Sequence, residues 1–317
     1  MAGSGAPGAN PDGAGPCVAV VGMGRSGTSA TAGLLVNLGL SGPRPDDLVP
    51  PTKSNERGHW ESRAVVRCNA RLLRAVGSSG HCPPPVMLDW SGVDGYAVQR
   101  ADALRWFRAN DAGRPMMVKD PRMCMTLSFW REVVPVPMAA VFVLREPVRV
   151  ARSLQARDRL PVSLGLALWD RYVRAAMIGL TGLPVLVVHY DEMVADRAAG
   201  TARVAAFLDG LGVAVDPAAA DAASTWFDPN LRHQRSTTDD YADTASVQRA
   251  LFTQLIGGPD FHPVWEPPPV PDPPAWVDDV IALRRQLQNT RRQLRGIQGT
   301  RAYRTARSLK RLAHLGR

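Results

Sequence analysis

The sequence predicts an α/β fold, in which a central parallel sheet is flanked by helices on both faces and a basic helical tail follows. Three observations lead to this prediction. Short apolar runs typical of buried strands alternate with longer segments whose apolar residues recur at helical spacing. A glycine-rich turn joins the first run to the first such segment. Polar residues stand directly after the apolar runs, where ligands bind in sheets of this kind.

The first predicted element is the strand Cys17–Val21, a short apolar run rich in β-branched residues. Gly22–Gly27 then forms a turn, and a helix whose leucines share one face begins at Thr28. The first turn of a helix leaves backbone N–H groups without partners, and glycines allow an anion to approach them. Arg25 adds a positive charge here. The sequence therefore predicts a site for a phosphate-like group, with hydroxyl side chains around it at Ser26, Thr28 and Ser29.

Three kinds of phosphate loop share this design, and the letters GMGRSGTS distinguish between them. The dinucleotide fingerprint G-x-G-x-x-G fits, but it needs a second strand that ends in an acidic residue about 20 residues later. Asp46 and Asp47 occupy that region and follow prolines, not a strand. The ATPase loop G-x-x-x-x-G-K-[ST] fails because Thr28 replaces its lysine. The cation at Arg25 indicates a third kind of loop, and an ordinary strand-to-helix turn is the alternative.

The same alternation of elements continues after the loop. Helices are predicted over residues 64–76, 95–110, 148–155, 163–177 and 191–208, and strands over 116–120, 138–144 and 184–190. Strands that alternate with helices imply a parallel sheet, whose carboxyl ends share one edge. We therefore expect four residues that end predicted strands to meet at that edge: Gly22, Lys119, Arg145 and Tyr190.

The C-terminal part has a different composition. Gly257–Pro274 contains eight prolines, which interrupt both helices and sheets, so residues 257–276 are interpreted as a semi-rigid linker. A basic amphipathic helix is predicted over 277–317, with the a and d positions of a short coiled coil at Val280, Leu283, Leu287, Thr290, Leu294 and Ile297. The expected organisation is a flexible leader over 1–16, a catalytic domain over 17–256, the linker and the tail.

The net charge of +9 belongs to the tail and does not indicate nucleic-acid binding. Residues 277–317 contain eleven basic and two acidic side chains, whereas residues 1–276 contain 27 of each. The tail suits either peripheral contact with anionic lipid or self-association, and the sequence leaves both open.

The four cysteines form no C-x-x-C pair, which favours a reducing cytoplasm and argues against structural zinc. The leader lacks the features of a signal peptide, and no apolar run is long enough to span a membrane.

Four motifs together resemble the bacterial branch of the sulfotransferases that use 3′-phosphoadenosine 5′-phosphosulfate (PAPS). GMGRSGTS, NERGHWE, VKDPR and VLREPVRVARS occur in this order at the ends of predicted elements. The resemblance covers about residues 17–235 and implies the P-loop NTPase-like sulfotransferase fold. It also implies PAPS as the co-substrate, with no metal required.

The resemblance assigns donor-binding roles to particular residues. Arg25 corresponds to a basic residue that contacts the phosphosulfate, and Arg145 and Ser153 correspond to the pair that binds the 3′-phosphate. Arg232 corresponds to a late basic residue over the nucleotide. The remaining residues of the loop would supply amide and hydroxyl donors, namely Gly24, Ser26, Gly27, Thr28 and Ser29. The alternative for Arg145 is a pairing with Glu146 or Asp170, with Ser153 facing solvent.

Removal of the acceptor proton requires a base. Glu61 is the first candidate, because it ends the segment in which related enzymes carry a catalytic carboxylate. His59 is the second candidate, and Lys119 is a predicted cation beside the donor or acceptor. The alternative for Glu61 is an N-terminal helix residue stabilised by the helix dipole. Asp120 is interpreted as a partner of Arg122 or of a loop amide.

The leading hypothesis is therefore an enzyme that transfers a sulfuryl group from PAPS to a hydroxyl. The acceptor is a small molecule, a carbohydrate or a glycolipid, and Trp60 and Trp90 are candidate aromatic faces for a sugar. A second hypothesis is a nucleotide-dependent kinase, which needs a lysine in place of Thr28 and for which Asp120 is the candidate Mg²⁺ ligand. A third is a non-catalytic binding module that acts through its basic tail.

Overall fold

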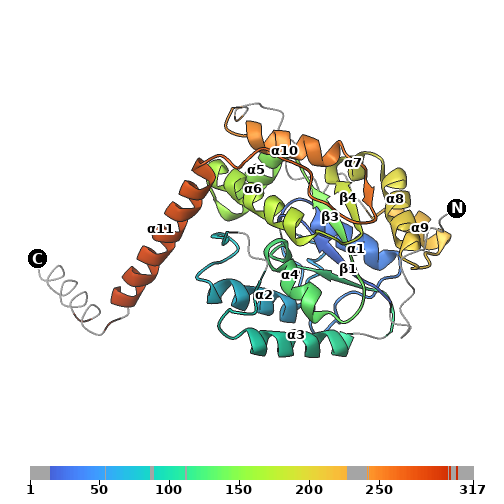
Figure 1. Ribbon diagram of the computed structural model, residues 1–317, viewed down its shortest axis with the longest axis horizontal. Helices are drawn as coiled ribbons and strands as arrows, with labels where there is room; N and C mark the ends of the chain where they lie inside the picture. The colour runs from blue at the N-terminus through green and yellow to red at the C-terminus, as the bar shows by residue number, and fades with distance from the viewer. Residues whose placement is uncertain are drawn as a thin grey trace, which may run out of the picture.

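The fold is built on a five-stranded sheet with the order β2-β1-β3-β4-β5 (Figure 1). The computed structural model describes residues 15–53, 55–85, 89–110, 113–226, 241, 243–298, 300 and 305. Four strands run parallel, namely β1 (Cys17–Val21), β2 (Met116–Lys119), β3 (Met138–Leu144) and β4 (Val185–His189). This arrangement confirms the α/β class with a central parallel sheet.

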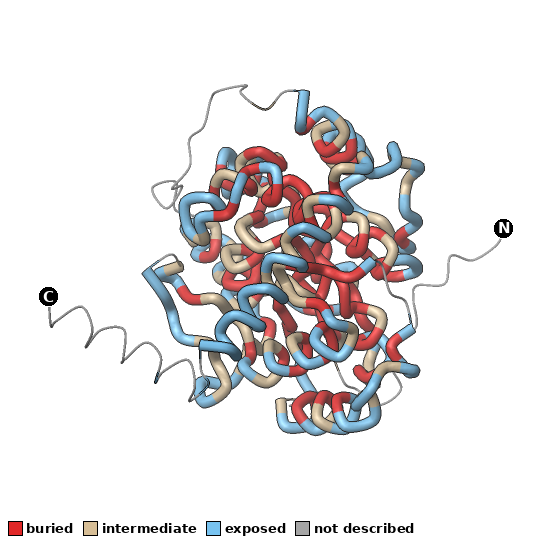
Figure 2. Tube along the Cα trace, turned by 90° about the vertical axis from the view of Figure 1, so that its left-hand side faces the viewer, coloured by how far each residue is buried: buried red, intermediate tan, exposed pale blue. Residues whose placement is uncertain are grey.

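Helices cover both faces of the sheet, because every parallel strand is apolar on both of its sides. In β1, Cys17, Ala19 and Val21 join one buried cluster, and Val18 and Val20 join the other. The first cluster contains residues of α2 (Arg63–Ala75), α3 (Tyr96–Asn110), α4 (Met123–Val133), α5 (Pro147–Asp158), α6 (Val162–Gly179) and α10 (Ser246–Ile256). The second contains residues of α1 (Thr28–Asn37), α7 (Tyr190–Ala195), α8 (Arg197–Gly210) and α9 (Pro217–Ser224). Figure 2 shows the buried residues gathered in the interior of the molecule, with exposed residues around them.

Helices α9 and α10 were not predicted, and two further helical segments also differ from the sequence-based expectation. The segment expected as one helix over 191–208 is divided into α7 and α8 at Asp196, whose side chain accepts a hydrogen bond of 3.0 Å from the Ala199 N–H group. This side chain caps the start of α8, as aspartate often does. Helix α4 was not predicted, and eight of its eleven residues are buried. A helix that is buried on most sides lacks the alternation of polar and apolar residues that would reveal it.

The proline-rich segment contributes to the sheet, contrary to expectation. Phe261–His262 forms β5 and pairs antiparallel with Val185 and Leu186 of β4. Trp265 is fully buried, and its indole N–H group donates to the Met177 carbonyl oxygen at 2.8 Å. The two residues of β5 are not prolines and lie at the edge of the sheet, where neighbouring prolines are tolerated.

The strand order defines one place where a ligand is expected to bind. Strand β1 lies between β2 and β3, so the chain leaves β1 toward one side of the sheet and leaves β3 toward the other. Ligands in such sheets bind outside the carboxyl ends of the strands at this switch point. The register pairs Val20 with Lys119 and Leu144 with His189, so these ends share one edge. The expectation that Gly22, Lys119, Arg145 and Tyr190 meet at one edge is confirmed.

Candidate active site

The loop 22–27 packs closely under the strand ends and leads into α1. Arg25 and Gly27 both have a left-handed backbone, with φ values of 77° and 97°. A Cβ atom at Gly27 would lie 2.0 Å from the Cδ2 atom of Tyr190, so a side chain does not fit there. Gly27 is also the N-cap of α1 and offers no side chain to the first N–H groups of the helix. Those N–H groups therefore remain available to an anion.

The other predicted loop residues lie at the same point. Ser26 and Thr28 are buried, and Ser29 accepts a hydrogen bond of 3.0 Å from Lys119 Nζ. Gly24 lies beside Pro121, to whose ring a Cβ atom at Gly24 would come within 3.8 Å. The loop after β1 is thus in contact with the residues that follow β2.

Arg25, Arg145 and Ser153 form one cluster across the switch point. The Arg25 Nε–H group donates to Ser153 Oγ at 2.9 Å. The Arg145 Nη1–H group donates to the Arg25 carbonyl oxygen at 3.3 Å. Arg145 and Ser153 are both buried, at 7% and 4% exposure. The structure therefore brings together the residues predicted to bind the two ends of a nucleotide.

Positive charge dominates this cluster. Burial lowers the pKa of the Arg25 guanidinium, and the charges of Arg157 and Arg145 lower that pKa further. Asp191 lies 3.7 Å from Arg145 Nε and 3.6 Å from Arg149 Nη1, so one carboxylate is shared between two guanidiniums. The Arg145 guanidinium also lies 5.2 Å from the centroid of the Tyr190 ring. Cations gathered at low exposure favour the binding of a multiply charged anion.

The alternative partners considered for Arg145 are wrong. Glu146 accepts from the Arg149 N–H group at 2.8 Å and caps α5. Asp170 accepts from Arg174 Nε at 2.7 Å. Ser153 does not face solvent but lies against Arg25.

Lys119 connects the loop to the segment that carries the candidate bases. Its ammonium group donates to Glu61 Oε1 at 2.5 Å, to Ser29 Oγ at 3.0 Å and to the His59 carbonyl oxygen at 3.1 Å. The Lys119 side chain is 2% exposed and that of Glu61 is 13% exposed. An ammonium group has three donors, so these contacts use all of them. The ion pair fixes the Glu61 carboxylate beside the phosphate loop.

Glu61 lies outside the helix that follows it. Helix α2 begins at Arg63, and its N-cap is Ser62, whose hydroxyl accepts from the Val65 N–H group at 3.2 Å. The expectation that Glu61 is a helix residue stabilised by the dipole is therefore wrong. Its carboxylate turns toward Lys119 instead.

His59 is held by a different set of contacts. Its Nε2 atom lies 3.1 Å from Thr52 Oγ1, and its Nδ1 atom lies 3.3 Å from Asn55 Nδ2. Burial lowers the pKa of the imidazole, which favours its neutral form. With the Asn55 amide as donor, Nδ1 accepts and Nε2 donates to Thr52. Both ring nitrogens are then engaged by the protein.

Asp120 has a structural role, as expected. Its Oδ1 atom accepts from the Arg122 N–H group and from Arg122 Nε, both at 2.9 Å, and its Oδ2 atom accepts from Asn69 Nδ2 at 3.0 Å. Asp120 is fully buried. Because both oxygens are bound by protein donors, the observation does not favour this carboxylate as the Mg²⁺ ligand that a kinase needs.

One tryptophan differs from its expected role, and another has a role that was not expected. Trp90 is 1% exposed and lies in the hydrophobic core, so it offers no face to a sugar and that expectation is wrong. Trp226 was not singled out by its sequence, yet its ring lies 6.0 Å from that of Trp60 in an edge-to-face pair. Its indole N–H group donates to the Ala30 carbonyl oxygen at 2.8 Å. A Cβ atom at Gly33 would lie 2.3 Å from Trp226. The glycine inside α1 was therefore the sequence signal for a large side chain packed against this helix.

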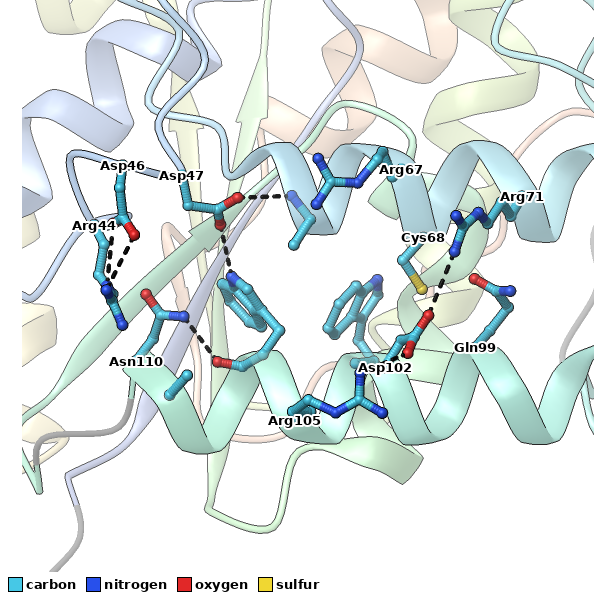
Figure 3. A pocket seen from close by; sticks show the side chains of 15 residues that line it. Arg44, Asp46, Asp47, Arg67, Cys68, Arg71, Gln99, Asp102, Arg105 and Asn110 are labelled. Carbon is cyan, nitrogen blue, oxygen red and sulfur yellow. Dashed lines mark hydrogen bonds and ion pairs between the residues drawn. The ribbon is translucent and has the colours of Figure 1, made fainter.

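A hollow lies away from this cluster, between α2 and α3, with a volume of about 410 Å³ (Figure 3). Its charged side chains pair with one another, as in Arg71 with Asp102 at 3.4 Å. None of the predicted site residues lines it. We therefore do not assign it to the candidate active site.

Some predicted features remain outside this description. Arg232 and residues 299, 301–304 and 306–317 of the tail lie outside the described residues. Among the residues that are described, no group of three or more His, Cys, Asp or Glu side chains could hold a metal ion. No helix in the described ranges combines the length and apolar character needed to cross a membrane.

Part of the chain matches a known protein family. Residues 16–213 match the model of the sulfotransferase family. A solved structure described as the sulfotransferase domain from the Synechococcus PCC 7002 olefin synthase is similar, with 17% sequence identity and a TM-score of 0.38. That alignment covers 86% of this chain and 96% of the other. No curated protein matches the chain. The residues matched by the family model include β1 to β4 and the predicted site residues other than Arg232.

Proposed function

The chain belongs to the sulfotransferase family, and on that premise we propose that it transfers the sulfuryl group of PAPS to a hydroxyl of a carbohydrate, glycolipid or other small acceptor. The cluster of Arg25, Arg145 and Ser153 between the ends of β1 and β3 is the observation that carries this proposal. Two guanidiniums and a buried hydroxyl beside the N-terminus of α1 suit the phosphate groups of a single nucleotide.

The contacts within this cluster support the donor-binding roles that the family resemblance implies. We assign Arg145 and Ser153 to the 3′-phosphate, and Arg25 with the amides and hydroxyls of residues 24–29 to the phosphosulfate. Arg25 and Ser153 now satisfy each other at 2.9 Å. Donor binding replaces this bond with charge-assisted ones, because the 3′-phosphate accepts from Ser153 and the phosphosulfate accepts from Arg25. The negative charge of both groups offsets the crowding of guanidiniums.

The proposed reaction is a single in-line displacement. The acceptor hydroxyl loses its proton to the Glu61 carboxylate while its oxygen forms a bond to sulfur. The bond between sulfur and the bridging phosphate oxygen breaks, and the electron pair stays on that phosphate. The products are a sulfate ester and 3′-phosphoadenosine 5′-phosphate, and no metal is required.

Glu61 is favoured over His59 as the base by the contacts of the two side chains. Lys119 contacts Oε1 of Glu61, which holds the carboxylate in one orientation beside Ser29. Both ring nitrogens of His59 face Thr52 and Asn55 instead. A base must reach the acceptor proton, so a side chain with a fixed and available oxygen suits the role. We assign Lys119 to orienting Glu61 and to neutralising charge between donor and acceptor.

The acceptor class is supported by the aromatic pair beside the proposed base. Trp60 precedes Glu61 in the chain and meets Trp226 edge to face. Aromatic side chains supply apolar faces while nearby polar groups orient a ligand, which suits the ring of a sugar.

The four cysteines are buried free thiols, which supports the cytoplasm as the location of the enzyme.

Isothermal titration calorimetry tests the donor assignment. We expect 3′-phosphoadenosine 5′-phosphate to bind the wild-type chain without metal and more tightly than ATP with Mg²⁺. Arg145→Ala should lose about 10-fold to 100-fold in affinity, because it removes a charged donor to phosphate. Arg105→Ala is the control, since Arg105 is exposed and pairs with Asp102 on α3. A preference for ATP with Mg²⁺ would overturn the donor assignment.

A further inference from the structure

Helix α11 (Trp276–Gln298) projects from the body beside α6 (Figure 1). One of its faces is attached to the body. Val277 and Ile281 pack with Ala167 of α6, and Asp278 pairs with Arg171. The contacts continue to Gln288, whose side-chain oxygen accepts from Cys82 Sγ at 3.3 Å. The position of α11 is therefore fixed by residues on one side of the helix.

The opposite face of α11 is apolar and exposed. Four of the seven large hydrophobic side chains that are exposed among the described residues lie on it, namely Leu283 (63%), Leu287 (43%), Leu294 (50%) and Ile297 (58%). With Thr290 they form a seam with spacings of 4, 3, 4 and 3, so the exposed seam occupies alternating d and a positions of a heptad. An exposed apolar seam on a helix that the body already holds indicates a partner.

The flanks of this seam differ from each other. Arg284 and Arg291 occupy the e positions on one flank. Asp279, Gln286 and Gln293 occupy the g positions on the other flank. One flank is therefore cationic, and the other is acidic or neutral.

We propose that this seam pairs with the same seam of a second copy of the chain, in a parallel, in-register, two-stranded coiled coil. In a parallel pair the e positions of one helix face the g positions of the other, so Arg284 meets Asp279 of the second copy and Arg291 meets Gln286. In an antiparallel pair, e positions face e positions and arginine meets arginine. The charge pattern of the flanks therefore selects the parallel arrangement.

A lipid surface fits the same helix less well. The seam uses only the a and d positions, which is the narrow stripe of a coiled coil, and Thr290 stands in its middle. A helix that lies on a membrane has a wider apolar face, with a strongly charged face opposite. Here the flank with Gln286 and Gln293 carries no cation. The seam of fewer than three heptads implies a dimer that dissociates on dilution.

Sedimentation equilibrium of the full chain tests the pairing. The wild type should shift with concentration from a monomer of 34.3 kDa toward twice that mass. Leu287→Asp with Leu294→Asp should remain monomeric. Asn289→Asp with Gly296→Asp is the matched control, because it adds the same charge to exposed positions of α11 outside the seam. This control should dimerise as the wild type does.

Two outcomes would overturn the pairing. One is a wild type that stays monomeric at every concentration. Binding of such a monomer to phosphatidylserine vesicles would assign the seam to a lipid surface instead. The other is a seam variant that dimerises as well as its control. Circular dichroism of both variants checks that α11 is retained equally, so that loss of the helix is distinguished from loss of the seam.

Disulfide formation tests the orientation. Ile297→Cys should cross-link under mild oxidation, because a parallel in-register pair brings the two copies of residue 297 together. Gly296→Cys, one position away and outside the seam, should cross-link far less. The four native cysteines are buried, so the wild type gives the background. Cross-linking of Leu283→Cys with Leu294→Cys, but of neither variant with itself, would show an antiparallel pair and overturn the proposed arrangement.

Discussion

Cationic side chains gather in two regions of this chain, at the strand ends and along α11, and they are buried in the first region and exposed in the second. Lys119 and Arg145 at the strand ends are 2% and 7% exposed, whereas Arg291, Arg292 and Arg295 of α11 are all exposed. Burying a cation costs several kcal/mol unless a counter-charge is present, while an exposed cation costs little. The energy of the two buried cations therefore depends on their partners Glu61 and Asp191, whereas on α11 only the arrangement of charge around the seam is informative.

The largest expected effect tests whether the buried region is catalytic. Glu61→Gln should lower turnover by about 100-fold to 10,000-fold, because an amide cannot take the acceptor proton. The affinity for 3′-phosphoadenosine 5′-phosphate should stay close to that of the wild type. Sulfate transfer and calorimetry measure the two quantities. Glu56→Gln is the control, since Glu56 is an exposed carboxylate in the same segment. Full turnover in Glu61→Gln would assign the base to another residue, with His59 first.

The second test compares a buried ion pair with an exposed one. Lys119→Met leaves the Glu61 carboxylate without its partner at low exposure, and should lower the free energy of unfolding by about 3–5 kcal/mol. Arg71→Met removes one of the two arginine partners of Asp102, in a pair whose side chains are 50% and 38% exposed. This change should cost less than about 1 kcal/mol. Urea denaturation measures both values.

The double variant Lys119→Met with Glu61→Gln sharpens this comparison. Removing the unpaired carboxylate should recover part of the lost stability, because the amide carries no charge that needs a partner. Equal losses for Lys119→Met and Arg71→Met would mean that burial does not decide the energy of these pairs.

A smaller effect is expected at Ser153, within the buried cluster. Ser153→Ala removes the acceptor of the Arg25 Nε–H group and one proposed donor to the 3′-phosphate. The affinity for 3′-phosphoadenosine 5′-phosphate should fall by about 2-fold to 10-fold, as expected for one uncharged hydrogen bond. Ser163→Ala, at the start of α6, is the control in calorimetry. A loss as large as that of Arg145→Ala would indicate that Ser153 mainly positions Arg25.

The strand ends also show how far the sequence could predict the site. Lys119 and Arg145 were identified because apolar runs before them predicted parallel strands, and parallel strands place their carboxyl ends at one edge. The contact between Lys119 and Glu61 could not be predicted, because it joins residues 58 positions apart through the packing of α2. Trp226 lacked any periodic context that would have connected it to Trp60.

The fold shows the same division between local and tertiary signals. Strands such as Met138–Leu144 were predicted because a run that is buried on both faces is apolar throughout. Strand β5 has only two residues and depends on the edge of β4, which is a tertiary neighbour. The limits of the catalytic domain, the linker and the tail remain predictions.

The smallest expected effect concerns a group that burial keeps neutral. Burial lowers the pKa of His59. The negative charge of Glu61 raises this pKa, and the positive charges of Lys119, Arg157 and Arg25 lower it. As the pH falls through about 6.5, the unfolded chain therefore takes up a proton at His59 before the folded chain does. The folded state loses stability over that range, and the loss ends once the pH is below the pKa of the folded state.

His59→Gln should therefore make the free energy of unfolding less dependent on pH below about pH 6.5. A proton that is bound only in the unfolded state changes the free energy of unfolding by about 1.4 kcal/mol per pH unit. The change in slope should stay well below this value, because the ring of His59 is only half-buried. Burial lowers the pKa of His81 as well, so His81→Gln should remove the contribution of His81 to the pH dependence. The double variant should remove the contributions of both histidines. An unchanged slope in His59→Gln would mean that His59 takes up its proton equally in both states. Its ring would then be less desolvated than its contacts with Thr52 and Asn55 indicate, and His59 would regain its place as a candidate base.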